Sequence, residues 1–376
     1  MRVLVVGPRK GLCEALAEER IPYVVWTDAS RPLRSAERVH VAPIAVGKSA
    51  ARREAETLAA HGPFTHVIAG TEAAVVPAAA ARRVLGARLS AHTTVLRCHD
   101  KLRMKAHLRA RGIPMAPFVS PPEGGDPAKI VDNLGLPIVL KPRALSGGRE
   151  IEIVRDPAVL RTKRLRGRLL ESWVDAPEVS VESFVNNGRI LFENVTEYAR
   201  KTHVNVVPAG LDDATRAAAL ELNRIVIRAL RIQWGMTHLE MYLAAEGPLF
   251  GEIALRPPGG YIMDLLGLAW GFDSWRAFVA VEVDRAFAFP RAPKAHAAAV
   301  VLHPGPGTVA AIRGLADVRR RPEVVEARIR VRSGDRVKPR AGVSENVGHV
   351  VLCAPTREQL LEAWEDVDAR LRVELA

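Results

Sequence analysis

The stretch GPLFGEIALRPPGGY, residues 247–261, reads as a strand between two breaks in regular structure. Glycine and proline at its start predict a turn, and LFGEIALR predicts the strand that follows. Side chains on a strand alternate between its faces, so Glu252, Ala254 and Arg256 are expected on one face, with Phe250 behind them. The two prolines and two glycines that follow force the chain out of the sheet.

A second apolar run, GMTHLEMYL at residues 235–243, is joined to the first by the turn-like AAEGP. If the two runs pair as a hairpin, Glu240 comes next to Glu252, with Arg256 at the exit. Two carboxylates and an arginine suggest a site for a divalent metal and a phosphate group. An ordinary solvated strand face explains the same residues equally well. His238 shares the face of Glu240, where packing or hydrogen bonding is favoured over metal ligation.

The length of 376 residues predicts two or three domains, and 48% hydrophobic and 26% charged residues are globular values. Cys13, Cys98 and Cys353 are far apart and odd in number, which fits a reducing compartment without a disulfide framework. The start MRVLVVG does not resemble a signal peptide, and no apolar run approaches the length of a membrane span. A soluble, cytoplasmic protein without a membrane partner is therefore expected.

The net charge of +12, from 54 Lys and Arg against 42 Asp and Glu, raises the question of nucleic-acid binding. The basic residues are spread along the whole chain, and aromatic residues make up only 5%, so few side chains could stack on bases. A nucleic-acid partner is therefore a minor alternative.

The first 97 residues alternate strand and helix patterns, beginning with the apolar strand MRVLVVG. This rhythm is typical of an α/β fold with a parallel, doubly wound sheet. The first turn, GPRKG, lacks the G-x-G-x-x-G spacing of dinucleotide sites, so a nicotinamide enzyme is disfavoured.

After Cys98 the stretch HDKLRMKAHLRARGIPMAPF predicts a capped basic helix, on which Lys101 and Lys105 face the same way. The strand LGLPIVLKP then ends with Lys141, and a loop containing Ser146-Gly147-Gly148 follows. A glycine loop beside a lysine lets backbone N–H groups approach phosphate oxygens, although such a loop is more often only a turn. Its spacing differs from that of a P-loop.

Further strands are predicted at LLESWV, at PEVSVESFV and RILFENVTEY around an NNG turn, and again from about residue 293. A helix is predicted from Asp212 to Leu230, and two more within residues 262–287. The stretch TREQLLEAWEDVDARLRVEL, residues 356–375, predicts a terminal helix.

Taken in order, the DK-initiated helix ending in GIP, the LPIVLKP strand, the glycine loop, the ESWV…PEVSVE segment and the two acidic strands ending in RPPGG resemble the ATP-grasp superfamily. The C-terminal GTVAAIRG and RVRSGDRVKP…VGHVVL look like the closing domain of its L-amino-acid ligase branch. The resemblance implies an N-terminal βαβ domain (1–97), a two-lobed ATP-grasp domain (98–293, with a mobile lid at about 129–170) and a small β-rich α+β C-terminal domain (294–376).

For the phosphates, the resemblance implies that Lys101 and Lys141 contact the α- and β-phosphates of ATP, and that the Ser146, Gly147 and Gly148 loop closes over them. Glu240 and Glu252 would hold Mg²⁺ or Mn²⁺, and Arg256 would contact the transferred phosphoryl group.

For the nucleoside, Glu171, Trp173 and Val174 would form the hinge that reads adenine through backbone groups. Glu178 would bind the ribose hydroxyls, and Phe250 would be an apolar floor beneath adenine. One residue departs from the pattern, because the family usually has Asn where this chain has Ala254, which cannot ligate a cation.

The implied activity is ligation of a small carboxylate to an amine through an acyl-phosphate, with Lys141 and Arg256 acting in catalysis and ADP and phosphate as products. Activation of bicarbonate by the same fold stays open, and the residues do not identify either substrate. The oligomeric state is also open, with a homodimer as one expectation.

Overall fold

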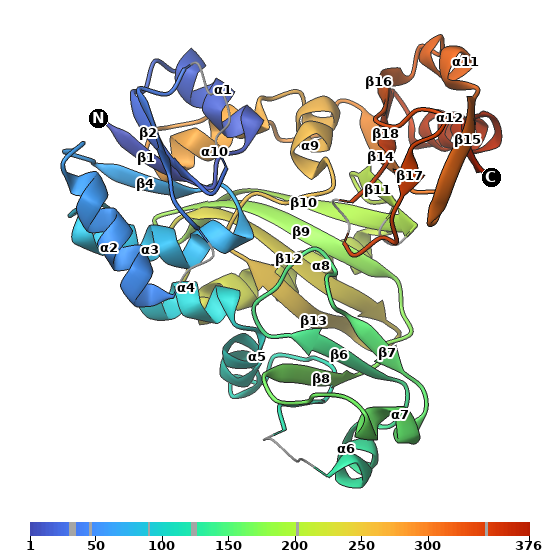
Figure 1. The fold of residues 1–376 in the computed structure, drawn as a ribbon, viewed down its shortest axis with the longest axis horizontal. Helices are drawn as coiled ribbons and strands as arrows, with labels where there is room; N and C mark the ends of the chain where they lie inside the picture. The colour runs from blue at the N-terminus through green and yellow to red at the C-terminus, as the bar shows by residue number, and fades with distance from the viewer. Residues whose placement is uncertain (30–34, 45–46, 89–90, 122–125, 201–202, 343–344) are drawn as a thin grey trace.

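The computed structural model of the protein describes all residues except 30–34, 45–46, 89–90, 122–125, 201–202 and 343–344. An N-terminal parallel sheet, a small lobe, a large antiparallel sheet and a C-terminal part follow one another along the chain (Figure 1). The α/β class that the sequence predicts is confirmed.

The N-terminal sheet has four parallel strands in the order β3-β2-β1-β4. The strands are Val3–Val6 (β1), Tyr23–Thr27 (β2), Arg38–Val41 (β3) and His66–Ala69 (β4). Around them lie the helices Lys10–Glu18 (α1), Lys48–Ala59 (α2) and Val75–Val84 (α3), with a single 3-10 turn at Glu72–Ala74. The predicted βαβ rhythm is confirmed, whereas the polar edge strand β3 was not predicted.

Two short helices, His92–His99 (α4) and Lys101–Arg109 (α5), lead into the small lobe. The Asp100 carboxylate accepts hydrogen bonds from the first N–H groups of α5, as expected for the predicted polar cap.

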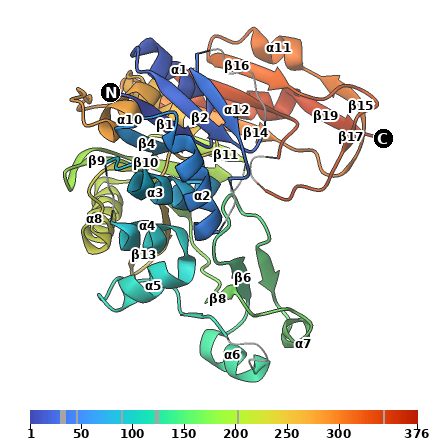
Figure 2. The ribbon, with the colours of Figure 1, turned by 60° about the vertical axis from the view of Figure 1, so that its left-hand side comes forward.

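The small lobe is a four-stranded sheet in the order β5-β8-β6-β7. It consists of Phe118–Val119 (β5), Ile138–Pro142 (β6), Glu152–Val154 (β7) and Arg168–Ser172 (β8), with helices Pro127–Leu134 (α6) and Pro157–Arg161 (α7). Alternate residues such as Ile138, Leu140 and Val154 form its own core. The lobe projects from the rest of the molecule (Figure 2), and its movement as a lid stays a prediction.

The large sheet has eight strands in the order β13-β12-β9-β10-β11-β14-β18-β16, and the paired neighbours are antiparallel. Its strands are Glu178–Asn186 (β9), Arg189–Arg200 (β10), Val204–Val207 (β11), Gly235–Ala244 (β12), Gly247–Ala254 (β13), His296–Leu302 (β14), Val324–Ile329 (β16) and Gly348–Ala354 (β18). The helix Asp213–Leu230 (α8) packs on the face of β9 that bears Val179 and Val181. Because β11 pairs with β14, the sheet runs without a break past the predicted domain boundary at 293/294.

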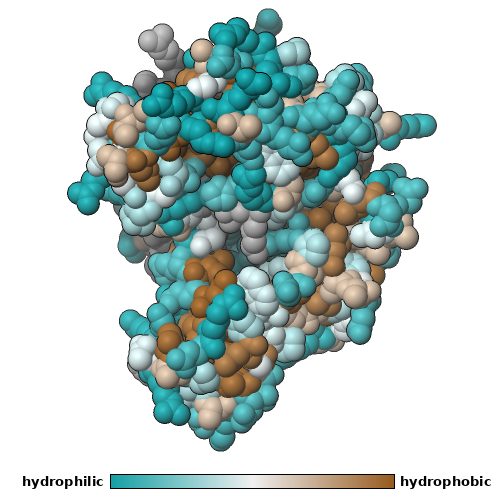
Figure 3. All heavy atoms as spheres, turned by 90° about the vertical axis from the view of Figure 1, so that its right-hand side faces the viewer, coloured by the Kyte–Doolittle hydropathy of each residue, from teal (hydrophilic) through white to brown (hydrophobic). Residues whose placement is uncertain are grey.

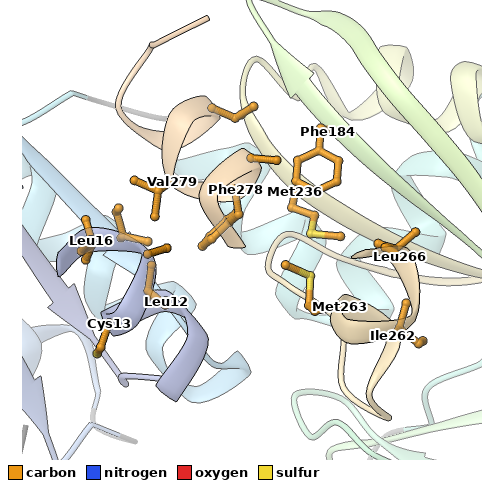
Figure 4. Packing of buried hydrophobic residues seen from close by; sticks show 14 of the residues in the cluster. Leu12, Cys13, Leu16, Phe184, Met236, Ile262, Met263, Leu266, Phe278 and Val279 are labelled. Atoms are coloured by element: carbon orange, nitrogen blue, oxygen red, sulfur yellow. The ribbon is translucent and has the colours of Figure 1, made fainter. Parts of the chain in front are cut away.

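The helices Ile262–Trp270 (α9) and Ser274–Glu282 (α10) fill the space between the large sheet and the N-terminal sheet. Figure 4 shows Leu12 and Leu16 of α1 facing Phe278 and Val279 of α10, with Met236 of β12 on the far side. This shared core ties the N-terminal domain to the sheet that carries the acidic hairpin.

The C-terminal part adds a three-stranded sheet, β17-β15-β19, formed by Gly307–Arg313 (β15), Arg336–Val337 (β17) and Arg372–Leu375 (β19). Its helices are Leu315–Arg319 (α11) and Arg357–Arg370 (α12). The predicted terminal helix is therefore wrong at its end. The β-branched Val373 and its neighbours pair with β15 instead of continuing the helix.

Within the described residues, no helix has the length and apolarity needed to cross a membrane.

Candidate active site

The acidic hairpin β12–β13 pairs as predicted, with Glu240 directly opposite Glu252. A bulge follows this pair, because Met241 is paired with Phe250 and Gly251 is left as the extra residue. A Cβ on Gly251 would lie 2.8 Å from the Glu240 carbonyl oxygen, so only glycine fits there. The two carboxylates thus share one face of the sheet, and the hard oxygen donors fit a divalent cation such as Mg²⁺.

The same bulge turns Phe250 to the opposite face, beside Met241, where the ring is fully buried. Lys105 Nζ lies 5.6 Å from the centre of this ring. Because the ring is fully buried in this conformation, the expected contact with adenine stays a prediction. The strict alternation from which the position of Phe250 relative to Glu252 was expected fails where the extra residue is inserted.

Cationic and polar groups surround the two carboxylates. Lys101 Nζ lies 3.2 Å from Glu252 Oε2, and the Tyr198 hydroxyl donates to Glu240 Oε1 at 3.2 Å. Burial alone would raise the pKa of Glu240, but the hydrogen bond and charge of His238, with the charges of Lys141 and Lys101, lower it to about 2. The Glu240 carboxylate is thus ionised at neutral pH, as a cation ligand must be.

A buried network lies behind Glu240. His238 Nδ1 is 2.9 Å from Glu182 Oε1, and His238 Nε2 is 3.4 Å from Glu240 Oε1. Burial alone would lower the pKa of His238, but the two glutamates raise it to about 9. The ring therefore bridges the two carboxylates as a cation, with both of its nitrogens engaged.

Glu182 is fully buried and also accepts hydrogen bonds from the side chains of Ser180, Asn194 and Thr196. Sequence reasoning missed this residue. The signal was present, because Ser180 and Glu182 alternate with Val179 and Val181 and so mark a polar face on a central strand.

A second buried cluster lies where the small lobe meets α5. The Glu171 carboxylate contacts Lys105 Nζ at 2.7 Å and Lys141 Nζ at 2.6 Å, and all three residues are at least 92% buried. Burial alone would raise the pKa of Glu171, but the two lysines lower it to about 2. One carboxylate therefore serves two ammonium groups, which leaves an excess of positive charge.

The two lysines respond differently to this shared partner. For Lys141, burial lowers the pKa but is outweighed by Glu171, so the pKa rises above its usual range. For Lys105, burial outweighs Glu171, and the nearby charge of Lys141 lowers the pKa further. Glu171, predicted as a hinge residue, thus contacts both lysines through its side chain. For Lys105, the sequence had indicated only that it lies on the same helix face as Lys101.

The glycine loop lies close to the predicted phosphate lysines. Lys101 Nζ donates to the Leu145 carbonyl at 2.7 Å, and Gly147 and Gly148 adopt the positive φ values of 71° and 72° that favour glycine. Together with Ser146 the loop faces the C-terminal part, since a Cβ on Gly342 would lie 3.1 Å from the Gly147 carbonyl oxygen.

At the hinge, the Trp173 N–H donates to the Pro137 carbonyl at 3.0 Å, and the chain runs on through Val174 to Glu178. Glu178 begins β9 opposite Tyr242 of β12, two residues from Glu240. This places Glu178 at the same end of the sheet as the hinge, and its contact with ribose stays a prediction.

The small lobe also presents exposed apolar side chains that were not predicted. Ile153 is opposite Val139 in the sheet, and Val139 lies two residues before Lys141, so these side chains share the face that bears the lysine cluster. Ile151 and Ile153 are 43% and 44% exposed, and apolar surface is visible on this lobe in Figure 3. The alternation of these isoleucines with Glu150 and Glu152 could have predicted a strand with one apolar face.

Arg256 leaves β13 and contacts the N-terminal domain. Its Nε is 3.0 Å from Glu72 Oε2, and Glu72 Oε1 is 2.8 Å from His99 Nδ1. Burial would raise the pKa of Glu72, but His99 and Arg256 lower it below its usual range. Glu72, in the 3-10 turn that follows β4, is thus the partner that orients Arg256.

Three kinds of known protein are similar to this chain: a domain family, curated relatives and solved structures. Residues 300–376 match the family "L-amino acid ligase C-terminal domain 2". The chain is 28% identical over 243 residues (60% of this chain) to the L-arginine-specific L-amino acid ligase of Bacillus subtilis. The matches cover 62% and 59% of two curated relatives, so the chain spans about three fifths of their length.

Solved structures share the whole fold. The L-amino acid ligase of Bacillus licheniformis has a TM-score of 0.85 at 19% identity, over 100% of this chain and 98% of that one. The carboxyaminoimidazole ribonucleotide synthase of Aspergillus clavatus, solved with ATP, has a TM-score of 0.77 at 21% identity, over 98% and 97% of the two chains. The chain therefore has the fold of these two ligases, and its residues 300–376 are similar to the C-terminal domain of L-amino acid ligases.

Proposed function

We propose that this protein is an ATP-dependent ligase that joins a small carboxylate, such as that of an amino acid, to an amine. The observation that carries the proposal is the pairing of Glu240 with Glu252 on one sheet face, with Lys101 in contact and Arg256 at the strand exit. The similarity of residues 300–376 to L-amino acid ligases favours an amine as the acceptor.

In the proposed site, Glu240 and Glu252 would hold Mg²⁺, which neutralises charge on the ATP phosphates when it is bound. Lys101 now contacts Glu252, and in the complex it would turn its ammonium group to a phosphate oxygen. Lys141 stays protonated because Glu171 holds its pKa high, so it carries a full charge toward the phosphates. Arg256, oriented by Glu72, would stabilise the phosphoryl group during transfer.

The chemistry requires little covalent work from the protein. A carboxylate oxygen of the substrate attacks the γ-phosphorus, ADP leaves, and an acyl-phosphate forms. The amine then attacks the acyl carbon, phosphate leaves, and the amine loses a proton. The chain orients the reactants and excludes water, and the glycine loop and the apolar face of the small lobe are suited to that exclusion.

The test is phosphate release from Mg-ATP across pairs of L-amino acids and other small carboxylates and amines, with mass analysis of the product. Phosphate release that needs both substrates, with an amide product, supports the ligase. The structurally similar ribonucleotide synthases make bicarbonate the natural competitor. Bicarbonate-dependent release without an amino acid would overturn the amide-forming assignment and assign carboxylation instead.

A further inference from the structure

Arg9, in the turn between β1 and α1, reaches the loop that follows the acidic hairpin. Its guanidinium lies 4.6 Å from the ring centre of Trp275 on α10. Gly11 lets the turn approach that ring, since a Cβ there would lie 2.3 Å from Trp275 Nε1. The stacking fixes the plane of the Arg9 guanidinium.

Arg9 and Arg256 share a hydrogen-bond acceptor. Arg9 Nη1 donates to the Pro258 carbonyl at 2.5 Å and to the Pro257 carbonyl at 3.2 Å, and Arg256 Nη1 donates to the same Pro257 carbonyl at 2.9 Å. Two guanidinium groups are therefore neighbours at the exit of β13, next to the proposed reacting centre.

Their charges are not balanced within the protein. Glu72 pairs with Arg256, whereas Arg9 has no carboxylate within ion-pair distance among the described residues. Asp264, exposed on α9, interacts with Arg9 only at longer range. Burial, with the charge of Arg256, lowers the pKa of Arg9 to about 10, which leaves it protonated at neutral pH.

One edge of the Arg9 guanidinium is unused. Among the described residues, Arg9 donates hydrogen bonds only through its Nη1. The edge of the guanidinium formed by Nε and Nη2 therefore has no acceptor among them. A planar fork of two N–H groups matches the two oxygens of a carboxylate. An anion bound there would also offset the repulsion between Arg9 and Arg256.

We propose that the free edge of Arg9 binds the carboxylate of an amino acid whose amine attacks the acyl-phosphate. The inference rests on the proposed ligase function and narrows the acceptor to amines that carry a carboxylate. The amine and carboxylate of an amino acid are separated by one or a few carbons. When the amine lies at the reacting centre beside Arg256, the carboxylate of the same molecule therefore lies near Arg9. Arg9 thereby selects the acceptor and does not touch the reacting phosphorus.

The experiment fixes the activated carboxylate and Mg-ATP and varies the acceptor. The acceptors are the L-amino acid found active in the phosphate-release screen, its carboxamide, O-phosphoethanolamine and hydroxylamine, which traps the acyl-phosphate without a carboxylate. The wild-type protein should use the amino acid with a KM about 10- to 100-fold below that of the carboxamide. Equal use of the two would overturn the inference, and a preference for O-phosphoethanolamine would replace the carboxylate by a phosphate.

Variants locate the effect at Arg9. Arg9→Gln should raise the KM for the amino-acid acceptor by about 10- to 100-fold, with a much smaller effect on hydroxamate formation, and Arg9→Lys should recover part of the loss. The matched control is Arg276→Gln on α10, which pairs with Glu19 on the surface and should leave both reactions unchanged.

Three results would overturn the inference: an unchanged acceptor KM in Arg9→Gln, an equal loss of hydroxamate formation, or a rise in the KM of the activated carboxylate instead. Failure of the proposed function is distinct, because the wild-type protein would then release no phosphate with any pair of substrates.

Discussion

Two buried charge clusters flank the proposed ATP site, and they carry opposite net charge. The cluster between α5 and the small lobe joins Lys105, Glu171 and Lys141, while the cluster within the large sheet joins Glu182, His238 and Glu240. In the first, two cations share one carboxylate, and in the second a protonated histidine lies between two carboxylates. Each cluster lacks one charge, and the missing sign is the one that phosphate or a metal ion would supply.

The comparison also separates two structural roles. The positive cluster connects a helix to a lobe and is built across segments far apart in the sequence. The negative cluster is built across paired strands, where His238 and Glu182 are direct neighbours. Changes in the first should therefore affect folding of the interface between lobe and helix, and changes in the second should affect the proposed metal site.

The largest effect is expected from removal of the shared carboxylate. Glu171→Gln leaves Lys105 and Lys141 buried together without a counter-charge, so the free energy of unfolding should fall by about 3–5 kcal/mol. Urea and thermal unfolding measure this loss. Glu152→Gln, which removes a more exposed partner of Lys163 in the same lobe, should change stability by less than about 1 kcal/mol. Similar losses in both variants would mean that the buried, shared carboxylate of Glu171 contributes no more to stability than an exposed one.

Glu252→Gln tests the negative side. The variant should remain folded but lose about 3–4 kcal/mol of transition-state stabilisation, or roughly 10²- to 10³-fold in ATP turnover, because one proposed metal ligand is neutralised. Phosphate release at saturating Mg-ATP is the measurement. Glu246→Gln, in the exposed turn of the same hairpin, is the control. Wild-type turnover in Glu252→Gln would refute the metal assignment.

His238 gives the negative cluster a dependence on pH. Its folded pKa of about 9 lies above the ordinary 6.5, so its contribution is complete below about pH 6.5 and is lost as pH rises through 9. His238→Gln should lower stability at pH 6 by on the order of 2 kcal/mol and flatten the decline between pH 7 and 9.5. Unfolding without divalent cations at each pH measures this, with His61→Gln as a surface control. A slope equal to the wild type would contradict a protonated bridge.

The smallest effect is expected at Ala254, which is the cross-strand neighbour of His238. Ala254→Asn adds an amide oxygen beside Glu252, so the Mg²⁺ concentration for half-maximal activity should fall by roughly two- to tenfold. Titration of Mg²⁺ at fixed ATP measures it, and Ala244→Asn at the turn end of β12 is the control. A higher Mg²⁺ requirement would mean that the amide disturbs His238 rather than binding the cation.

Local patterns in the sequence predicted the fold and the acidic residues of the hairpin. The facing of Glu240 and Glu252 follows from two apolar runs and a short turn, and Lys101 follows from its place after the helix cap at Asp100. The order of such motifs along the chain indicated the resemblance to ATP-grasp ligases, and the fold matches solved ligase structures. The bulge at Gly251 could not be predicted, because the extra residue is visible only in the register of the paired strands.

Contacts between distant segments could not be predicted either. Lys105 meets Glu171 across the boundary between helix and lobe, Glu72 meets Arg256 across the domain interface, and Arg9 lies next to Arg256 through the Pro257 carbonyl. No local pattern in the sequence distinguishes these charged residues, because the partner of each lies far away along the chain.

The unbroken sheet across β11 and β14 has a practical consequence for anyone who cuts or recombines this protein. A chain that stopped near residue 293 would leave β11 with an unpaired edge bearing Val204 and Val206, which invites aggregation. Chimaeras that exchange the C-terminal part with a relative should therefore take β11 and β14 from the same protein, so that the backbone hydrogen bonds between the two strands are kept.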